Sequence, residues 1–266
     1  MIETITVLGG RGKNGDPDAV SSVDLTMGDV VSVVGATGSG KTTLINDIEL
    51  FANANTPSGR RVLVNGKAVP TEFRNDPARH PIALITQHTT FLSDMPVEDF
   101  LATHARIRAA SSPQAEELVG RTLAFADQLT GEPVPPRARM TELSGGQARA
   151  LLIADATIVC ATPIVLLDEV ENAGIDRTRA VELLRRERKI FVFVTHDPRI
   201  ALLSDYRVVM SNGTMSQLLR TDEQERRLLA RVSKLDDLMA RLRDAIRLGE
   251  RLSPQFLERP LPVAQL

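Results

Sequence analysis

Short apolar runs alternate with longer stretches of helical periodicity along most of the chain. Residues 30–34 are almost wholly apolar and lead directly into a glycine-rich loop, which is typical of a buried parallel strand followed by a turn. Helices are predicted over residues 97–129, with a break near 111–113, and over residues 146–159 and 177–188. Other strands are predicted at residues 2–8, 23–27, 61–67 with an Asn-Gly hairpin turn, 82–86, 164–167 and 190–195, and a strand pair with a turn at Asn212-Gly213 is predicted at residues 208–215. This alternation predicts an α/β core with a parallel sheet, interrupted by a helical insertion.

The pattern changes after residue 220. Residues 221–248 contain no glycine or proline, and their apolar positions recur alternately four and three residues apart, which predicts one amphipathic helix. The helix has two possible partners, the chain's own domain or a second chain. Its charges nearly cancel, which disfavours a membrane-surface helix. The apolar positions are Leu228, Val232, Leu235, Met239, Leu242 and Ile246.

Composition narrows the class of protein. The chain has 266 residues, is 42% hydrophobic and 25% charged, and carries a formal net charge of -2, so we expect no nucleic-acid partner. Cys160 is the single cysteine, which excludes an internal disulfide, and its apolar neighbours predict a buried small side chain. There is no apolar run of about 18–20 residues and no signal-peptide pattern. We therefore expect a cytoplasmic protein, either free or held at the inner face of the cell membrane by other chains.

The glycine-rich loop carries the first chemistry. Gly35-Ala36-Thr37-Gly38-Ser39-Gly40-Lys41-Thr42 lies between a predicted strand and a predicted helix, where backbone N–H groups can converge on phosphates. Lys41 is expected to reach the β- and γ-phosphates, and the Thr42 hydroxyl to bind Mg²⁺. Asp168 ends a later apolar strand, where a carboxylate is costly unless a cation compensates it. These residues predict a nucleotide and Mg²⁺ site.

Leu143-Ser144-Gly145-Gly146-Gln147, the signature segment, makes this prediction more specific. Downstream of such a loop and upstream of Asp168-Glu169, it resembles the ATP-binding cassette (ABC) ATPases. The resemblance implies a P-loop NTPase core with a mixed parallel sheet, an N-terminal antiparallel β-subdomain, an inserted helical subdomain and a C-terminal helical extension. The expected domain spans residues 1–215, with the helical subdomain at about 88–160 and the extension at 216–266.

The resemblance also implies ATP and Mg²⁺ as ligands and roles for single residues. The expected catalytic residues are Glu169, which polarises the attacking water, His196 and Gln87. Mg²⁺ is assigned to Thr42, Gln87 and Asp168. The residues expected to bind ATP phosphates are Gly35, Thr37, Gly38, Ser39, Gly40, Lys41, Thr42 and Thr43. In a dimer, the ATP bound by one copy is expected to be contacted by four residues of the other copy: Ser144, Gly145, Gly146 and Gln147. Asp176 is expected to lie at the dimer contact.

The chain departs from the family at several places. No aromatic residue precedes the phosphate loop, so Arg11 is the candidate to stack on adenine; the alternative is a flexible glycine turn with weak base recognition. Val170-Glu171-Asn172 follows the acidic pair where Pro-Thr is usual, and Asp155 stands where Arg is usual. These departures indicate a divergent member. His80, His88 and His104 have no motif around them and are assigned no role.

Two functions remain open. The first is the ATP-hydrolysing subunit of an importer-type membrane transporter, supported by residues 91–101, which are similar to the segment that contacts a membrane subunit in importers. The second is a soluble ABC ATPase that remodels or activates a cytosolic partner, favoured by residues 170–172 and the C-terminal helix. A chromosome-type cassette is not supported, because the chain has no long insertion in the cassette. A P-loop kinase or GTPase is not supported, because it would not explain the presence of the signature segment. The sequence indicates no transported or remodelled substrate.

Overall fold

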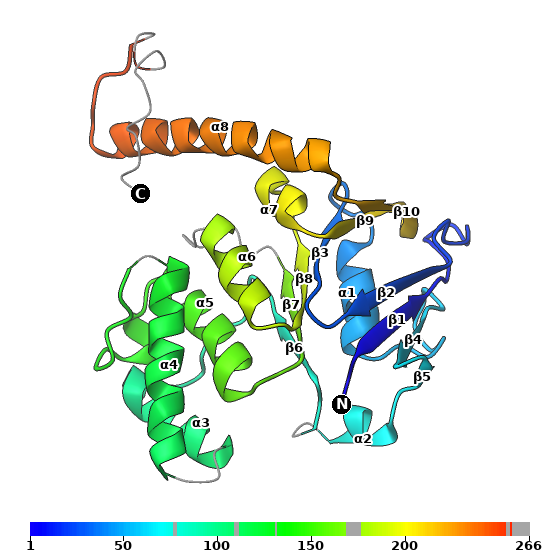
Figure 1. Cartoon of the computed structure of the whole chain (residues 1–266), viewed down its shortest axis with the longest axis horizontal. Helices are drawn as coiled ribbons and strands as arrows, with labels where there is room; N and C mark the ends of the chain where they lie inside the picture. The colour runs from blue at the N-terminus through cyan, green and yellow to red at the C-terminus, as the bar shows by residue number, and fades with distance from the viewer. Residues whose placement is uncertain (77–78, 109–111, 131, 169–176, 254–255, 257–266) are drawn as a thin grey trace. The chain divides into compact units, whose positions relative to one another are not determined.

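The structure is a computed structural model that describes residues 1–266 except 77–78, 109–111, 131, 169–176, 254–255 and 257–266. The chain divides into two compact units, Met1–Arg220 and Thr221–Leu266. Among these described residues, the first unit contains two sheets and the helices around them, and the second contains one long helix (Figure 1).

A six-stranded sheet forms the centre of the first unit, in the order β10-β9-β3-β8-β7-β6. Strands β9, β3, β8, β7 and β6 are parallel, and β10 pairs antiparallel with β9. Successive residues of the central strands enter two different cores, which explains why these strands are almost continuously apolar. The bounds are β3 Val30–Val34, β6 Ile82–Ile85, β7 Ile164–Asp168, β8 Ile190–Val194, β9 Tyr206–Ser211 and β10 Thr214–Arg220.

A second, antiparallel sheet of four strands covers one core, in the order β2-β1-β4-β5. Alternate residues of β1 and β2 are buried, because side chains along a strand point to opposite faces. Helix α1 (Lys41–Glu49) shares this core through Leu44, Ile45 and Ile48. The strands are β1 Thr4–Leu8, β2 Ser22–Thr26, β4 Arg61–Val64 and β5 Lys67–Ala68, and the short helix α2 Thr71–Asn75 follows β5.

Helices cover the other face of the central sheet. Figure 1 shows α3, α4 and α5 grouped together, and their apolar side chains share one core with Val165 and Phe191 of the sheet. The helices are α3 Val97–Arg108, α4 Ser112–Thr130, α5 Gly145–Ala154, α6 Arg177–Arg186 and α7 Pro198–Leu203, with the 3-10 turn η1 Met140–Glu142 before α5.

The helix predicted over residues 146–159 is not uniform. It is α-helical to Ala154 and continues as a π-helical turn, η2 (Asp155–Val159). The prediction that Cys160 is a buried small side chain is wrong, because this residue is only partly buried and its Sγ lies 3.7 Å from His104 Nε2.

A buried ion network joins three parts of the first unit. Arg60 has no exposed surface, and its guanidinium contacts Asp18 Oδ1 at 2.8 Å and Asp47 Oδ2 at 3.2 Å. Asp47 lies on α1, and Asp18 also accepts hydrogen bonds from the backbone N–H groups of Gly10 and Met215. Burial alone would raise the pKa of Asp18, but the hydrogen bonds from Arg60, Gly10 and Met215 hold it below its usual value. The network fixes the glycine turn at residues 9–13 beside α1 and the β9–β10 turn.

The second unit contains α8 (Glu223–Arg247), which confirms the helix predicted after residue 220. Four residues of its apolar seam have exposed side chains, from 47% for Leu228 to 63% for Leu235. Within the unit, Arg241 Cζ lies 5.6 Å from the centre of the buried Phe256 ring.

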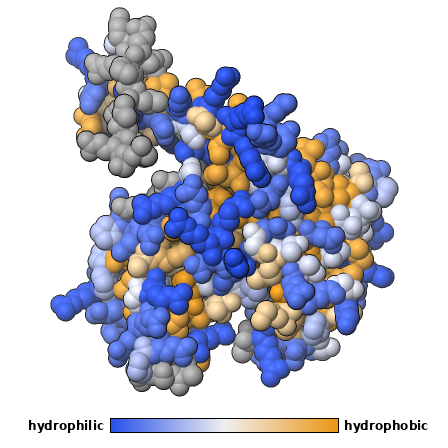
Figure 2. All heavy atoms as spheres, viewed as in Figure 1, coloured by the Kyte–Doolittle hydropathy of each residue, from blue (hydrophilic) through white to orange (hydrophobic). Residues whose placement is uncertain are grey.

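No helix among the described residues is long and apolar enough to cross a membrane. Figure 2 shows hydrophilic residues over most of one face of the molecule, with apolar residues in smaller patches between them.

Candidate active site

The connection between β3 and α1 is a loop whose backbone requires glycine. Gly40 caps α1 with φ +100°, and a Cβ on it would lie 2.8 Å from Gly213 Cα in the β9–β10 turn. A Cβ on Gly35, at φ +149°, would lie 2.4 Å from the Met210 carbonyl oxygen. The loop therefore adopts this path only because these positions have no side chain.

Lys41, the first residue of α1, is only 7% exposed yet carries an ammonium group. Its Nζ donates hydrogen bonds to the carbonyl oxygens of Gly35 at 2.9 Å and Ala36 at 3.1 Å. These bonds hold the ammonium against the loop, at the helix end where the backbone N–H groups have no partner within the helix. Both features favour an anion at this place.

A cavity of about 240 Å³ opens at this loop. It brings together the start of α1 with the ends of β7 and β8 and with His196, two residues beyond β8, because the carboxyl ends of parallel strands meet at one edge of the sheet. Its lining consists of Lys13, Thr37, Gly38, Gly40, Lys41, Thr42, Thr43, Asp168, Val194 and His196.

Lys13 is a cavity residue that sequence reasoning did not identify. Its Nζ donates to the Gly38 carbonyl at 2.7 Å, and its backbone N–H donates to Asn212. The only signal in the sequence was its place in the glycine turn already considered for Arg11. Arg11 itself is exposed outside the cavity lining, with Nε donating to the Pro57 carbonyl at 3.4 Å, and its contact with adenine stays a prediction.

Gln87 is exposed on the loop after β6 and is not among the residues that line the cavity. Its backbone carbonyl accepts a hydrogen bond from Arg149 Nη2 at 2.7 Å. Arg149 lies on α5, and burial lowers its pKa below the usual value. The loop that carries Gln87 is thus tied to the helix that begins at the signature segment.

Ser144 begins that helix as its N-cap. The Gln147 N–H donates to Ser144 Oγ at 3.2 Å, and the Ser144 N–H donates to Gln147 Oε1 at 3.0 Å, which forms a reciprocal capping box. Gln147 Nε2 also donates to the Pro133 carbonyl. Ser144 and Gly145 are exposed, Gly146 is partly buried, and none of them lines the cavity of its own chain.

Three predictions lie outside the described residues: the catalytic role of Glu169, the dimer contact of Asp176 and the atypical residues 170–172.

The donors at the cavity fit a polyphosphate with Mg²⁺. Ser39 belongs to the loop but does not line the cavity; it is buried, and its Oγ has no hydrogen-bond partner among the described residues. Lys41 supplies charge, and the exposed Thr42 hydroxyl and the Asp168 carboxylate are oxygen ligands of the kind Mg²⁺ prefers. These residues would hold the phosphates and the metal ion.

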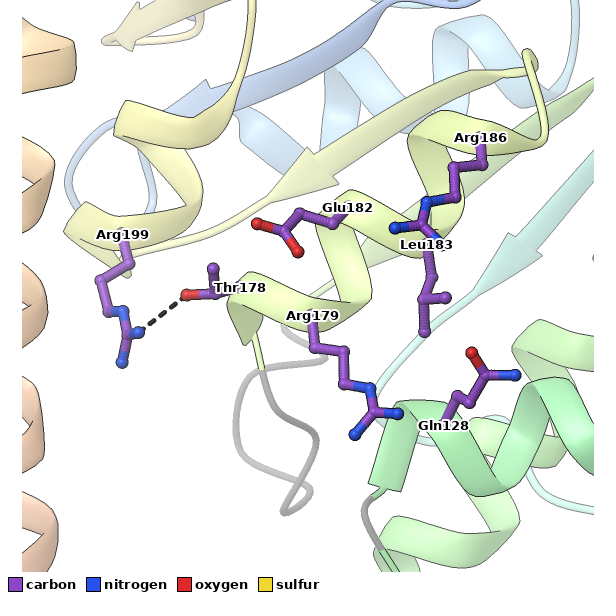
Figure 3. Close-up of a pocket in the computed structure, with 7 residues that line it drawn as sticks. All are labelled: Gln128, Thr178, Arg179, Glu182, Leu183, Arg186 and Arg199. Atoms are coloured by element: carbon purple, nitrogen blue, oxygen red, sulfur yellow. Dashed lines mark hydrogen bonds between the residues drawn. The ribbon is translucent and has the colours of Figure 1, made fainter. Parts of the chain in front are cut away.

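A second cavity, of about 420 Å³, lies between α4, α6 and α7 (Figure 3). Arg199 Nη2 donates to Thr178 Oγ1 at 2.7 Å on one side of it, and Figure 3 shows Arg179 directed toward Gln128 on the other. It is larger than the cavity at the loop but contains none of the predicted site residues, so we place the chemistry in the smaller one.

Comparison with known sequences gives the family. The sequence profile described as ABC transporter matches residues 20–172, more than half of the chain. An uncharacterized ABC transporter ATP-binding protein of Methanocaldococcus jannaschii is 45% identical over 252 residues, which cover 95% of each chain. The chain therefore belongs to the ABC transporter family and is one of its ATP-binding proteins, an ATPase.

Other relatives are longer than this chain. At 32% and 30% identity the chain resembles a glucan export ATP-binding/permease protein of Mesorhizobium japonicum and a spermidine/putrescine import ATP-binding protein of Bacteroides thetaiotaomicron. It spans 38% and 44% of their lengths, respectively.

Solved structures show the same fold. CbiO1 of Clostridium perfringens, part of the ABC transporter complex CbiONQ, matches with a TM-score of 0.64 at 22% identity, over 90% of this chain and all of that one. A dimeric ATP-binding cassette in a post-hydrolysis state, bound to ADP and Pi, matches with a TM-score of 0.61 at 20% identity, over 82% of this chain and 99% of that one. The predicted fold class is confirmed.

Proposed function

We propose that two copies of this chain close around two ATP molecules and that ATP hydrolysis separates them again. The observation that carries this proposal is the exposure of Ser144 and Gly145 at the start of α5, outside the cavity of their own chain. A helix N-terminus is a site for an anion, so in the dimer it contacts the γ-phosphate held by the neighbour. Asp176 lies at the dimer contact. The dimeric state of the similar cassette with ADP and Pi supports this arrangement.

Within each half-site, the loop binds the phosphates and the acidic strand end binds the metal. Gly35, Thr37, Gly38, Ser39, Gly40, Lys41, Thr42 and Thr43 surround the phosphates, with Lys41 on the β- and γ-phosphates. Thr42, Gln87 and Asp168 would bind Mg²⁺, which would supply positive charge beside the transferred phosphoryl group. The position of Thr42 and Asp168 on one cavity supports this assignment.

Hydrolysis needs a positioned water molecule. Glu169 polarises that water, His196 contacts the γ-phosphate and Gln87 senses the metal and the water. His196 already lines the cavity, whereas Gln87 lies on a loop outside its lining.

The dimer energises an importer-type membrane transporter and lies at the cytoplasmic face of the membrane. Residues 91–101 support this role, because Leu92 is fully exposed and Met95 is 41% exposed within a segment that is otherwise well anchored. Asp94 accepts hydrogen bonds from Arg139 and Thr141, which hold its pKa below the usual range, Thr141 most strongly. Such an exposed apolar pair on a fixed support suits contact with a helix of a membrane subunit.

The second candidate is an ATPase that remodels or activates a soluble partner protein. It is favoured by the exposed seam of α8, an apolar helix face of the kind that can bind a partner protein. In both cases residues 1–215 act as the ATPase domain, with a helical subdomain at about 88–160, and residues 216–266 as the extension.

Trapping the closed state tests the dimer. Glu169→Gln should bind ATP and Mg²⁺ without hydrolysing ATP, and should elute from a sizing column at twice the mass of the chain only when ATP is present. Glu171→Gln, which removes a carboxylate two residues away, serves as the matched control and should not accumulate a dimer. A Glu169→Gln protein that binds ATP yet remains monomeric would falsify the two-copy site.

The partner decides between the two candidate functions. The tagged chain, expressed in its own host and cross-linked before lysis, should co-purify with a membrane-spanning subunit. Leu92→Asp should abolish that association and leave ATP binding unchanged, with the exposed Leu50→Asp as control. Recovery of a soluble partner that survives Leu92→Asp and is lost on removing residues 221–266 would favour the second candidate.

A further inference from the structure

Three potential metal ligands meet in the helical part of the first unit, away from the nucleotide cavity. His104 lies on α3, Asp155 is the first residue of η2, and Cys160 directly follows η2. One ligand atom from each lies within 4.8 Å of the ligand atoms of the other two. His104 Nδ1 lies 2.9 Å from Asp155 Oδ1, and Cys160 Sγ lies 3.7 Å from His104 Nε2 and 3.8 Å from Asp155 Oδ2.

The π-helical turn is what brings two of the ligands together. In an α-helix, residues five apart point in different directions, but an i→i+5 hydrogen bond stacks them. The Cys160 N–H donates to the Asp155 carbonyl at 2.9 Å and closes such a turn. Single π-turns inserted in α-helices are frequent at functional sites.

The donor set is that of a borderline-soft divalent cation. Zinc is bound in proteins by thiolate, imidazole and carboxylate, with bonds of about 2.0–2.3 Å, so its ligand atoms lie roughly 3–4 Å apart. The Sγ–Nε2 and Sγ–Oδ2 distances lie in that range. The side chains of His104 and Asp155 are 25% and 13% exposed, which leaves access for an ion and a water molecule from solvent.

The cluster also supplies negative charge for a cation. A metal ion bound there would face the Asp155 carboxylate and would take the place of the protons on the ligating His104 nitrogen and on the Cys160 thiol.

We propose that His104, Asp155 and Cys160 bind one zinc-type divalent ion, with water as the remaining ligand. The ion cross-links α3 to the end of α5, opposite to the end of α5 that carries Ser144.

Cobalt binding to the full chain tests the proposal. Chelator-treated protein, without nucleotide, should take up one Co²⁺ with a thiolate-to-cobalt charge-transfer band, and Zn²⁺ should displace it. Cys160→Ser should lose this band, and His104→Asn and Asp155→Asn should each weaken Zn²⁺ binding by about 100-fold or more. His88→Asn, an exposed histidine outside the cluster, should bind like the wild type.

Two results would overturn the site. One is a wild-type titration without a thiolate band, and the other is undiminished Zn²⁺ affinity in Cys160→Ser. If the variants fail to fold, X-ray absorption of the zinc-loaded wild type gives the answer: one sulfur ligand at about 2.3 Å supports the site, and a shell of oxygen and nitrogen alone contradicts it.

Discussion

The guanidinium of Arg149 donates a hydrogen bond of 2.7 Å to the backbone carbonyl of Gln87, and so joins α5 to the loop after β6. Arg149→Met keeps much of the side-chain volume and removes this bond. We expect the ATP affinity to change by less than about twofold, because neither residue lines the cavity. The rate of hydrolysis should fall by about tenfold, which corresponds to the loss of a charged hydrogen bond of roughly 1.4 kcal/mol. Nucleotide titration and steady-state phosphate release measure the two effects.

Arg106→Met is the control for that change. Arg106 is exposed on α3, and its Nε bonds within its own helix to Ala102. It should hydrolyse ATP like the wild type. Equal rates in the two variants would mean that the Arg149–Gln87 contact does not position the loop for hydrolysis.

The buried Arg60 network predicts a large effect on stability. Arg60→Met leaves Asp18 and Asp47, whose side chains are 0% and 2% exposed, without their counter-ion. Removing one partner of a buried ion pair costs about 3–5 kcal/mol. Urea unfolding should show this loss, whereas the exposed neighbour Arg61→Met should stay within about 0.5 kcal/mol of the wild type. A loss for Arg60→Met no larger than for Arg61→Met would contradict the structure here.

Alanine substitutions at two glycines with positive φ distinguish the effect of backbone strain from that of a steric clash. Gly66, at φ +70°, would have no atom within 4 Å of an added Cβ, whereas a Cβ on Gly40, at φ +100°, would meet Gly213 at 2.8 Å. Both alanine variants should lose about 1–2 kcal/mol of stability to strain. Only Gly40→Ala should also weaken ATP binding, by about tenfold or more, because the phosphate loop must shift. Calorimetric ATP affinities that are the same in both variants would count against this loop geometry.

Lys189 predicts a dependence of stability on pH. It is buried, its Nζ donates to the Thr157 carbonyl, and burial lowers its pKa from 10.5 to about 8, against opposing effects of Glu187 and Cys160. Between these two values the unfolded chain binds more protons than the folded chain, so this residue's contribution to stability rises with pH, by at most about 3 kcal/mol. Below a pH of about 8, Lys189 is protonated in the folded chain, which then bears the full free-energy cost of burying its charge.

Lys189→Met removes that pH-dependent contribution. Urea unfolding at about pH 7.5 and about pH 9.5 should show the wild type gaining stability relative to Lys189→Met at the higher pH. The exposed Lys67→Met should keep the wild-type dependence. A constant difference between wild type and Lys189→Met at both pH values would show that the ammonium is solvated.

The sequence alone determined the elements that depend on neighbouring residues. The strand–loop–helix order around Lys41 and the capping box of Ser144 with Gln147 are encoded within a few residues, and the apolar central strands reflect burial on both faces of the sheet. The α/β core was predicted from the alternation of strands and helices, and the ABC-type fold from the resemblance carried by the signature segment. The strand pair after residue 208 was also predicted, although β10 runs past the expected Met215 to Arg220.

Only the tertiary structure decided which distant residues meet. Lys13 on Gly38, Arg149 on Gln87, and His104 with Asp155 and Cys160 join positions 25 to 62 residues apart, and no local pattern distinguishes these residue types from ordinary surface ones. The π-helical turn illustrates the reason. Nothing in the periodicity of residues 146–159 indicates it, and it becomes visible only where the packing of α5 places Asp155 and Cys160 against α3.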